Sequence, residues 1–346
     1  MVEFIQTLEE SESFRHLSPT DAADVYKELR RKVIGEGLLE RNYGYYAGLT
    51  TLIFTGFFGS FAGVYFSQSL FVVVLLSLLF AFFSVQIGGL VHDAGHRAVF
   101  RTPLANDVFA HSCTLVFAAC YSNWRINHNR HHASPNQVTR DPDMEIPYGF
   151  TPHRFNKLSG FMGAIKKFQK YTYLPFGTMA SLTMRYKRYD YFKENFGPSI
   201  YWEIALFFVS GFIRYIVPFV VLGFDKACLF LVVSTLFEGF YMFNIFAPNH
   251  KGMPEIGPGV RLSFLEQQVR TARNVRGHPI TDFVYLGLNY QIEHHLFPDT
   301  PRNNLRKLKP HVEEVCRKTG LHYSEAGVIE SNRLILSELG RISQTA

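Results

Sequence analysis

Long apolar runs without charged side chains constrain this fold more than any other feature. Residues 45–66 and 70–91 each give about 22 residues with no charge, long enough for a helix to cross a hydrocarbon core of ~30 Å. Two further apolar runs, 202–222 and 227–247, contain only isolated charges. Because lipid cannot hydrogen-bond to the backbone, these runs predict four transmembrane helices.

The segments between the runs predict how the chain is threaded through the membrane. The short connections 67–69 and 223–226 hold one basic residue between them, which predicts two helical hairpins. The segments 1–44 and 123–200 and the C-terminal region are rich in Lys and Arg. Since basic loops favour the cytoplasmic side, we expect both termini and any active site in the cytoplasm. A bacterial inner membrane is favoured, or the endoplasmic reticulum in a eukaryote.

Two charges lie inside the second pair of runs. Arg214 and Glu238 are at similar distances from the connection 223–226. A charge within a membrane is costly and is normally paired. We therefore expect an ion pair between Arg214 and Glu238.

These features predict one all-α integral membrane domain over residues 1–346, with four transmembrane helices as two hairpins and a cytoplasmic helical cap. Its expected parts are a cytoplasmic N-terminal helix in 1–44, a hairpin at 45–91, a cap segment at 92–201, a hairpin at 202–247 and a second cap segment at 248–346. The stretch 107–122 is apolar but short, which predicts an interfacial hairpin.

Helix-capping patterns mark the polar segments. Ser18, followed by a proline, predicts the start of a helix that ends near Gly35. Ser263 and Glu266 form a capping-box pattern before an amphipathic stretch, which we expect to lie on the membrane. The basic residues of that stretch are Arg270, Arg273 and Arg276.

The net charge of +6 fits a cap against anionic lipid head groups, and we expect no nucleic-acid partner. The cysteines are far apart and form no paired motif, so we expect free thiols. They are Cys113, Cys120, Cys228 and Cys316.

Eight of the 14 histidines fall in four short clusters, a pattern that predicts a metal site. They are His92 and His96; His128, His131 and His132; His250; and His294 and His295. Spacings of three and four residues place imidazoles on one face of a helix. Eight imidazoles suit two metal ions with about four nitrogens each.

The residue types alone leave the metal open, because imidazole binds zinc, copper, iron and nickel. No cysteine accompanies the clusters, which argues against structural zinc. A site beside apolar helices can receive a lipid chain, and two irons with O2 can supply an oxidant strong enough for an unactivated C–H bond.

Three motifs carry a resemblance to a known family. HDAGH at 92–96, HNRHH at 128–132 and QIEHH at 291–295, in this order around four apolar runs, resemble the membrane fatty-acid desaturases. The glutamine in the third motif resembles the front-end branch, which inserts a double bond between an existing one and the carboxyl end. The resemblance covers about residues 87–320. It implies a non-haem di-iron centre, O2 as co-substrate, an acyl or membrane-lipid substrate and an electron donor.

The resemblance also implies which side chains form the site. The iron ligands would be His92, His96, His128, His131, His132, His294 and His295, with His250 as an additional ligand. Residues near the ligands would orient the imidazoles, with capping or solvation as the alternative; they are Asp93, Asp141, Asn249, Gln291 and Glu293. Gln291 would lie at or near a ligand position. Trp124 and Arg125 would contact a substrate head group or anchor the chain at the interface.

Other functions remain open on this evidence. No HPGG haem motif occurs and the segment before the first apolar run is short, so we expect electrons from a separate ferredoxin or cytochrome b5. Hydroxylation, ketolation or acetylenic-bond formation on the same scaffold would differ only after the first hydrogen abstraction. A membrane metal transporter or receptor would place ligands inside the apolar runs, which contain no histidine.

Overall fold

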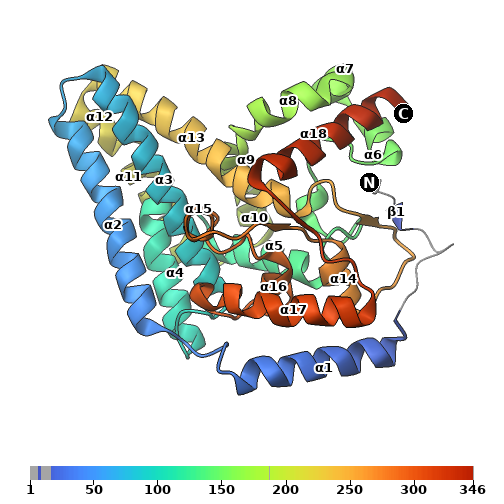
Figure 1. Cartoon of the computed structure of the whole chain (residues 1–346). Coiled ribbons are helices and arrows are strands. Elements are labelled where there is room, and N and C mark those ends of the chain that lie inside the picture. The colour runs from blue at the N-terminus through green and yellow to red at the C-terminus, as the bar shows by residue number, and fades with distance from the viewer. Residues whose placement is uncertain (1–6, 9–16, 187, 346) are drawn as a thin grey trace. The chain divides into compact units, whose positions relative to one another are not determined.

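The computed structural model describes residues 7–8, 17–186 and 188–345, and these are mostly helical (Figure 1). They form two compact units, which are described one at a time. Unit 1 comprises residues 1–40, 127–173 and 245–346, and unit 2 comprises residues 41–126 and 174–244. The expected single domain stays a prediction.

Four stretches are long and apolar enough to cross a membrane, as the sequence predicts. They are α2 (Tyr43–Phe66), α3 (Leu70–Gly95), the pair α11 (Tyr201–Tyr215) and α12 (Val217–Leu222), and α13 (Phe224–His250). Within unit 2, α2 packs along α3, and α4 (Pro103–Phe117) packs against both α3 and α11. Asn42 and Ser69 accept hydrogen bonds from backbone N–H groups at the starts of α2 and α3.

Proline and left-handed backbone change three predicted boundaries. Pro218 lacks an N–H group, and the predicted helix 202–222 is interrupted at Ile216 between α11 and α12. Gly223, with φ +77°, is the whole connection to α13, whereas the sequence indicated four residues. In place of a hairpin over 107–122, α4 ends at Phe117, Ala118 (φ 54°) caps it, and α5 (Tyr121–Ala133) follows.

The predicted ion pair in unit 2 is confirmed. Arg214 Nη2 lies 2.8 Å from Glu238 Oε2, and both side chains are buried. Arg185 of α9 (Ala180–Tyr186), which the sequence analysis did not single out, binds the other carboxylate oxygen at 2.5 Å. Glu238 is therefore shared by two guanidinium groups.

Short helices connect the spans. They are α6 (Pro152–Lys157), α7 (Gly160–Ile165), α8 (Gln169–Gly177), α9 and α10 (Arg188–Glu194), with 3-10 turns at Pro142–Met144 and Lys166–Phe168. Within unit 2, Gly239 of α13 allows the backbone before α9 to approach closely, because a Cβ there would lie 1.9 Å from the carbonyl oxygen of Thr178.

Unit 1 has a core of its own, built from helices far apart in the sequence. α1 (Pro19–Gly35) packs against α14 (Phe264–Arg270) and α17 (Leu305–Thr319), and α16 (Gln291–Leu296) packs against α14 and α17. Leu29, Leu265, Ile292 and Leu308 are among the buried side chains of this core. α15 (Pro279–Val284), α18 (Val328–Thr345) and the 3-10 turn Arg302–Asn304 complete the helices of the described residues (Figure 1).

Two pairs of very short parallel strands tie segments of unit 1 together. β1 (Thr7–Leu8) pairs with β2 (Glu255–Ile256), and β3 (Asn274–Val275) pairs with β4 (Glu325–Ala326). Of the predicted N-terminal segment 1–44, residues 1–6 and 9–16 lie outside the described residues.

The predicted helix caps are confirmed, but the amphipathic stretch after the second cap is helical only from Phe264 to Arg270. Ser18 accepts from the N–H of Asp21, and Ser263 and Glu266 form the capping box. Arg273 is buried and donates to the carbonyl oxygens of Pro248 and Lys251. The prediction was wrong for Arg273 because its charge satisfies backbone carbonyls that the proline-containing end of α13 leaves open.

The four cysteines carry free thiols, as predicted, and three of them are buried.

Candidate metal centre

The second histidine motif lies on α5, where its spacing places three imidazoles on one side. His128 Nε2 lies 3.1 Å from His132 Nε2, one helical turn away. The rings of His131 and His295 are 5.0 Å apart, although they are far apart in the sequence. The fold of unit 1 thus brings the second and third motifs together.

Three imidazole nitrogens from three helices converge at one point of unit 1. His131 of α5, His250 at the end of α13 and His295 of α16 are all buried. The Nε2 atom of His250 lies 3.3 Å from that of His131 and 3.1 Å from that of His295. The bonds of Arg273 to the end of α13 hold His250 in this place.

The opposite nitrogen of each ring contacts a hydrogen-bond acceptor. His131 Nδ1 lies 3.0 Å from both carboxylate oxygens of Asp141. His250 Nδ1 lies 3.0 Å from the carbonyl oxygen of Thr271, and His295 Nδ1 lies 2.8 Å from Gln268 Oε1. These contacts favour a proton on each Nδ1 and leave the lone pair on Nε2.

The orientation of the Gln268 amide is fixed independently, because its Nε2 donates to the carbonyl oxygen of His132 at 3.1 Å. In the neutral rings, three lone pairs would then face one another at hydrogen-bond distances, and the amide nitrogen of Gln291 also lies 2.9 Å from the lone pair of His250. A metal cation among them would accept all three. The arrangement of His131, His250 and His295 therefore fits a metal ion whose ligands are held by outer hydrogen bonds.

A second set of donor atoms lies beside the first. The ring nitrogens of His128, His132 and His294 lie within 4.8 Å of one another. The rings of His132 and His295 stack, with centroids 4.2 Å apart. Unit 1 thus holds six of the eight predicted ligands in two neighbouring groups, which fits two metal ions.

The first motif belongs to unit 2. His92 is in the last turn of α3 and His96 is the residue that caps this helix, with ring centroids 4.7 Å apart. Asp93 accepts a hydrogen bond from the Tyr46 hydroxyl at 3.0 Å, which ties the motif to α2. Gly95 permits the close approach of Trp124, because a Cβ would lie 2.4 Å from its ring.

A charged carboxylate supports one of the six ligands. Burial opposes protonation of His131, but the carboxylates of Asp141 and Asp143 outweigh burial and raise the pKa of His131. Burial alone would raise the pKa of Asp141, whereas His131 and the nearby hydrogen bonds lower it to about 2. Asp141 also accepts from the N–H groups of Asn136 and Asp143 at 2.8 and 2.9 Å. Asp141 is thus a fixed anion that makes His131 a more basic ligand.

The predicted near-ligand glutamine also lies at this point. Gln291 Nε2 is 2.9 Å from His250 Nε2, and Gln291 Oε1 accepts from Asn249 Nδ2 at 3.0 Å. Asn249 Nδ2 also contacts the carbonyl oxygen of Leu288 at 3.0 Å. The two side chains form a polar link between the end of α13 and the start of α16.

The chain matches a known family over most of its length. The profile of the fatty acid desaturase family matches residues 67–327. The chain belongs to the fatty acid desaturase family. It is therefore an oxidoreductase that desaturates fatty acids, and the sequence-based assignment of family and activity is confirmed.

Curated relatives of this desaturase agree with that assignment. A Delta(8)-fatty-acid desaturase of Euglena gracilis is 28% identical over 328 residues, covering 88% of this chain and 75% of the relative. The Delta(5) fatty acid desaturase fat-4 of Caenorhabditis elegans is 29% identical, with 86% and 69% covered. The Delta(6)-fatty-acid desaturase fat-3 of the same organism is 26% identical, with 92% and 75% covered.

The glutamate of the third motif, which was predicted to orient an imidazole or to cap a helix, is held by two polar side chains. Glu293 is buried and accepts from Asn274 Nδ2 and the Tyr323 hydroxyl, both at 2.7 Å. Burial raises the pKa of Glu293 to about 7, against these hydrogen bonds. Asn274 Oδ1 accepts from the backbone N–H of Ile292 at 2.9 Å. Glu293 thus fixes the start of α16 through Asn274, rather than through a direct contact with an imidazole.

Several residues that orient the predicted ligands of this desaturase have no signal in the motifs. Gln268 and Thr271 lie in and just after α14, and Asn136 follows α5. Asn136 Nδ2 donates to the carbonyl oxygen of His250 at 3.2 Å, and its φ is +52°. The only sequence signal was the capping box at Ser263, which marked α14 but not the direction of its side chains.

The two predicted head-group residues lie in unit 2. Trp124 packs against His92, with ring centroids 5.7 Å apart. Arg125 donates to Asp107 Oδ1 at 3.2 Å. Trp124 thus lies beside the first motif, whereas Arg125 is engaged by an acidic residue of α4.

Proposed function

We propose that this enzyme inserts a cis double bond into an acyl chain, using O2 and external electrons at a centre of two iron ions. The observation that carries the proposal is the convergence of three Nε2 atoms, each on a ring whose Nδ1 contacts an acceptor. When bound, a pair of irons supplies the oxidising power needed to remove hydrogen from unactivated methylenes.

We propose His92, His96, His128, His131, His132, His250, His294 and His295 as the iron ligands. For His92 and His96 the support is the order of the motifs along the sequence; for the other six it is also the geometry of unit 1. Asp141, Thr271 and Gln268 hold the proton on Nδ1 of their partner imidazoles and direct each Nε2 toward the metal. Gln291 and Asn249 hold the position of His250. We assign no side chain as a general base.

The relatives support a front-end position for the new double bond. They are named Delta(8), Delta(5) and Delta(6) desaturases, and this chain carries glutamine at the start of its third motif. The proposed substrate is an unsaturated acyl chain on a lipid or thioester carrier. The proposed electron donor is a separate ferredoxin or cytochrome b5.

The apolar helices and the charge distribution support the proposed topology. The four stretches would cross the membrane as two hairpins, with both termini and the histidine motifs in the cytoplasm. Single reporter cysteines in 67–69 and in the 123–200 segment, labelled from either side of sealed vesicles, test this arrangement. Labelling of both positions from the same side would contradict it.

The function is tested by expression in a host that is fed defined polyunsaturated acids. We expect a new double bond on the carboxyl side of an existing one, located by mass spectrometry. The purified protein should contain about two irons per chain. His131→Ala should abolish the product and lower the iron content, whereas His153→Ala should not, because His153 is exposed in the same unit. A hydroxylated product, or full activity of His131→Ala, would contradict the proposal.

A further inference from the structure

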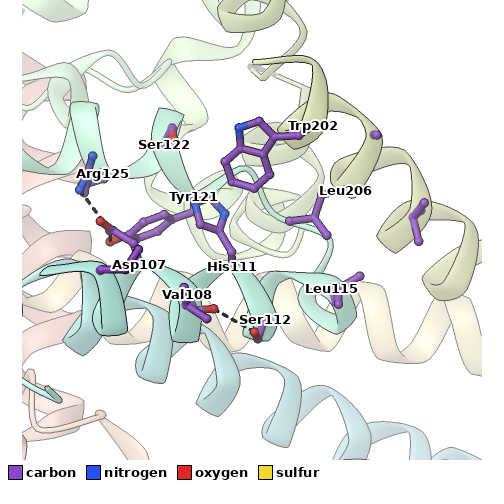
Figure 2. A pocket seen from close by; sticks show the side chains of 13 residues that line it. Asp107, Val108, His111, Ser112, Leu115, Tyr121, Ser122, Arg125, Trp202 and Leu206 are labelled. Atoms are coloured by element: carbon purple, nitrogen blue, oxygen red, sulfur yellow. Dashed lines mark hydrogen bonds and ion pairs between the residues drawn. The ribbon is translucent and has the colours of Figure 1, made fainter. Parts of the chain in front are cut away.

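A groove in unit 2 lies between α4, the start of α5 and α11, and the desaturase motifs do not account for it (Figure 2). Its volume is about 770 Å³, within the range of about 300–1,000 Å³ that is usual for small-molecule sites. Figure 2 shows Asp107 and Arg125 at one end and Leu115 and Leu206 at the other. The groove is thus amphipathic along its length.

The apolar part of the groove belongs to α4 and to α11, which is part of a candidate membrane span. Leu206 and Val209 lie on α11, which forms part of a membrane-spanning stretch, and Val108 and Leu115 lie on α4. The side chains of Val108 and Val209 are about half exposed. This wall can accommodate a hydrocarbon chain that enters from the bilayer.

The polar part lies at the start of α11, where a membrane helix meets the head-group region. Trp202, in the first turn of α11, lines the groove, and indole rings favour this depth of a membrane. The N–H of Ser122, at the start of α5, donates to Glu203 Oε1 at 2.8 Å and so joins the two helix starts. The Cys120 thiol also donates to Glu203 Oε1, at 3.2 Å. Glu203 is buried and does not line the groove.

At the polar end of the groove, the positive charges of two arginines exceed the negative charge of one aspartate, so one positive charge can attract an anion. Asp107 Oδ1 accepts from Arg97 at 2.7 Å, from Tyr121 at 2.8 Å and from Arg125 at 3.2 Å. Arg97 is the closest cation to this carboxylate, and only Arg125 of the two arginines lines the groove. Two guanidinium groups and one carboxylate give a net charge of +1. Within the described part of the chain, the hydrogen bonds of Arg125 use Nη1, so its remaining N–H groups can bind a phosphate.

The ring of His111 forms the wall between the two ends. It packs against Tyr121 and Trp202, with ring centroids 4.9 and 4.4 Å away. Burial lowers the pKa of His111, so this ring contributes no charge at neutral pH. Arg125 is therefore the cation that an incoming anion would meet.

We propose that this groove binds a glycerophospholipid, with the phosphate on Arg125 and one acyl chain along Val108, Leu206 and Val209. The charge at one end and the apolar wall at the other match the two parts of such a lipid. A free phosphate would use only the first part, and a neutral lipid only the second.

Native mass spectrometry of the purified full-length protein, titrated with phosphatidylglycerol or with diacylglycerol of the same chains, tests the proposal. We expect one saturable phosphatidylglycerol, no saturable diacylglycerol and no competition by inorganic phosphate. Arg125→Gln should weaken phosphatidylglycerol binding about tenfold, the effect of one charge-assisted hydrogen-bonding group. Arg101→Gln is the matched control, because Arg101 is exposed and does not line the groove.

A second pair of variants tests the apolar part. Val209→Trp should fill the groove and weaken phosphatidylglycerol binding about tenfold or more, as expected when a buried chain is excluded. Val220→Trp, at an exposed position of α12, should bind as the wild type does. Thermal unfolding of each variant shows whether it is folded. Unchanged binding by folded Arg125→Gln or Val209→Trp, or equal binding of diacylglycerol, would overturn the proposal, whatever the result for desaturase activity.

Discussion

Removal of the Glu238 carboxylate should destabilise unit 2 more than removal of either arginine that binds it. Glu238 is fully buried and pairs with Arg214 at 2.8 Å and with Arg185 at 2.5 Å. Glu238→Gln leaves two buried guanidinium groups without a counter-charge. Arg214→Met, in contrast, leaves Glu238 paired with Arg185.

The size of the effect follows from this asymmetry. Breaking a buried ion pair by removing one partner costs about 3–5 kcal/mol, and Glu238→Gln should lie at the upper end because two partners are stranded. For Arg214→Met we expect about 2 kcal/mol, which includes the lost contact of the guanidinium with the Phe80 ring, 4.7 Å away. The double variant should cost less than the sum of the two, with a coupling of about 1–3 kcal/mol.

Thermal unfolding of the purified protein in one detergent measures these differences. At about 2 °C per kcal/mol, Glu238→Gln should lower Tm by about 10 °C and Arg214→Met by about 4 °C. Glu194→Gln, at an exposed position of α10, should change Tm by about 1 °C or less. A Tm of Glu238→Gln within 2 °C of the wild type, or additive effects in the double variant, would refute the reasoning.

Two further predictions concern the metal centre and the packing beside the first motif. Asp141→Asn should weaken iron binding about 10- to 100-fold, and Gln268→Ala should have a smaller effect because only a neutral amide is lost. The iron content per chain after titration with a chelator measures both effects. Equal losses of iron in the two variants would contradict this ranking. Gly95→Ala should destabilise the protein by about 1–3 kcal/mol, because the new Cβ would lie 2.4 Å from the Trp124 ring. The control is Gly59→Ala, where the new Cβ would meet open space, and this variant should be neutral or stabilising. The same Tm assay measures both.

The features that the sequence predicted correctly depend on local patterns. A span such as α2 follows from the length of one apolar run, and a cap such as Ser263 depends on residues three positions apart. The Arg214–Glu238 pair was also predictable, because both residues lie at similar distances from one short connection. The interruption at Pro218 was missed because apolar length alone does not separate a straight helix from a broken one.

The parts that could not be predicted depend on contacts between distant segments. Arg185 lies outside the apolar runs and reaches Glu238 only because α9 packs near α13. Arg273 resembled a membrane-surface residue, since its spacing fits an amphipathic helix. Its burial follows from the carbonyl groups at the end of α13, which no local pattern in the sequence reveals.

The histidine motifs therefore predict which residues bind metal but not which nitrogen of each ring would do so. An imidazole can use either nitrogen, and the acceptor on the other nitrogen decides which one carries the lone pair. In unit 1 these acceptors come from outside the motifs: a carboxylate for His131, a backbone carbonyl for His250 and a neutral amide for His295. A carboxylate increases the basicity of its ring more than a neutral acceptor does. His131 should thus be the strongest donor of the three, and the three Nε2 atoms should differ in donor strength although all belong to histidines.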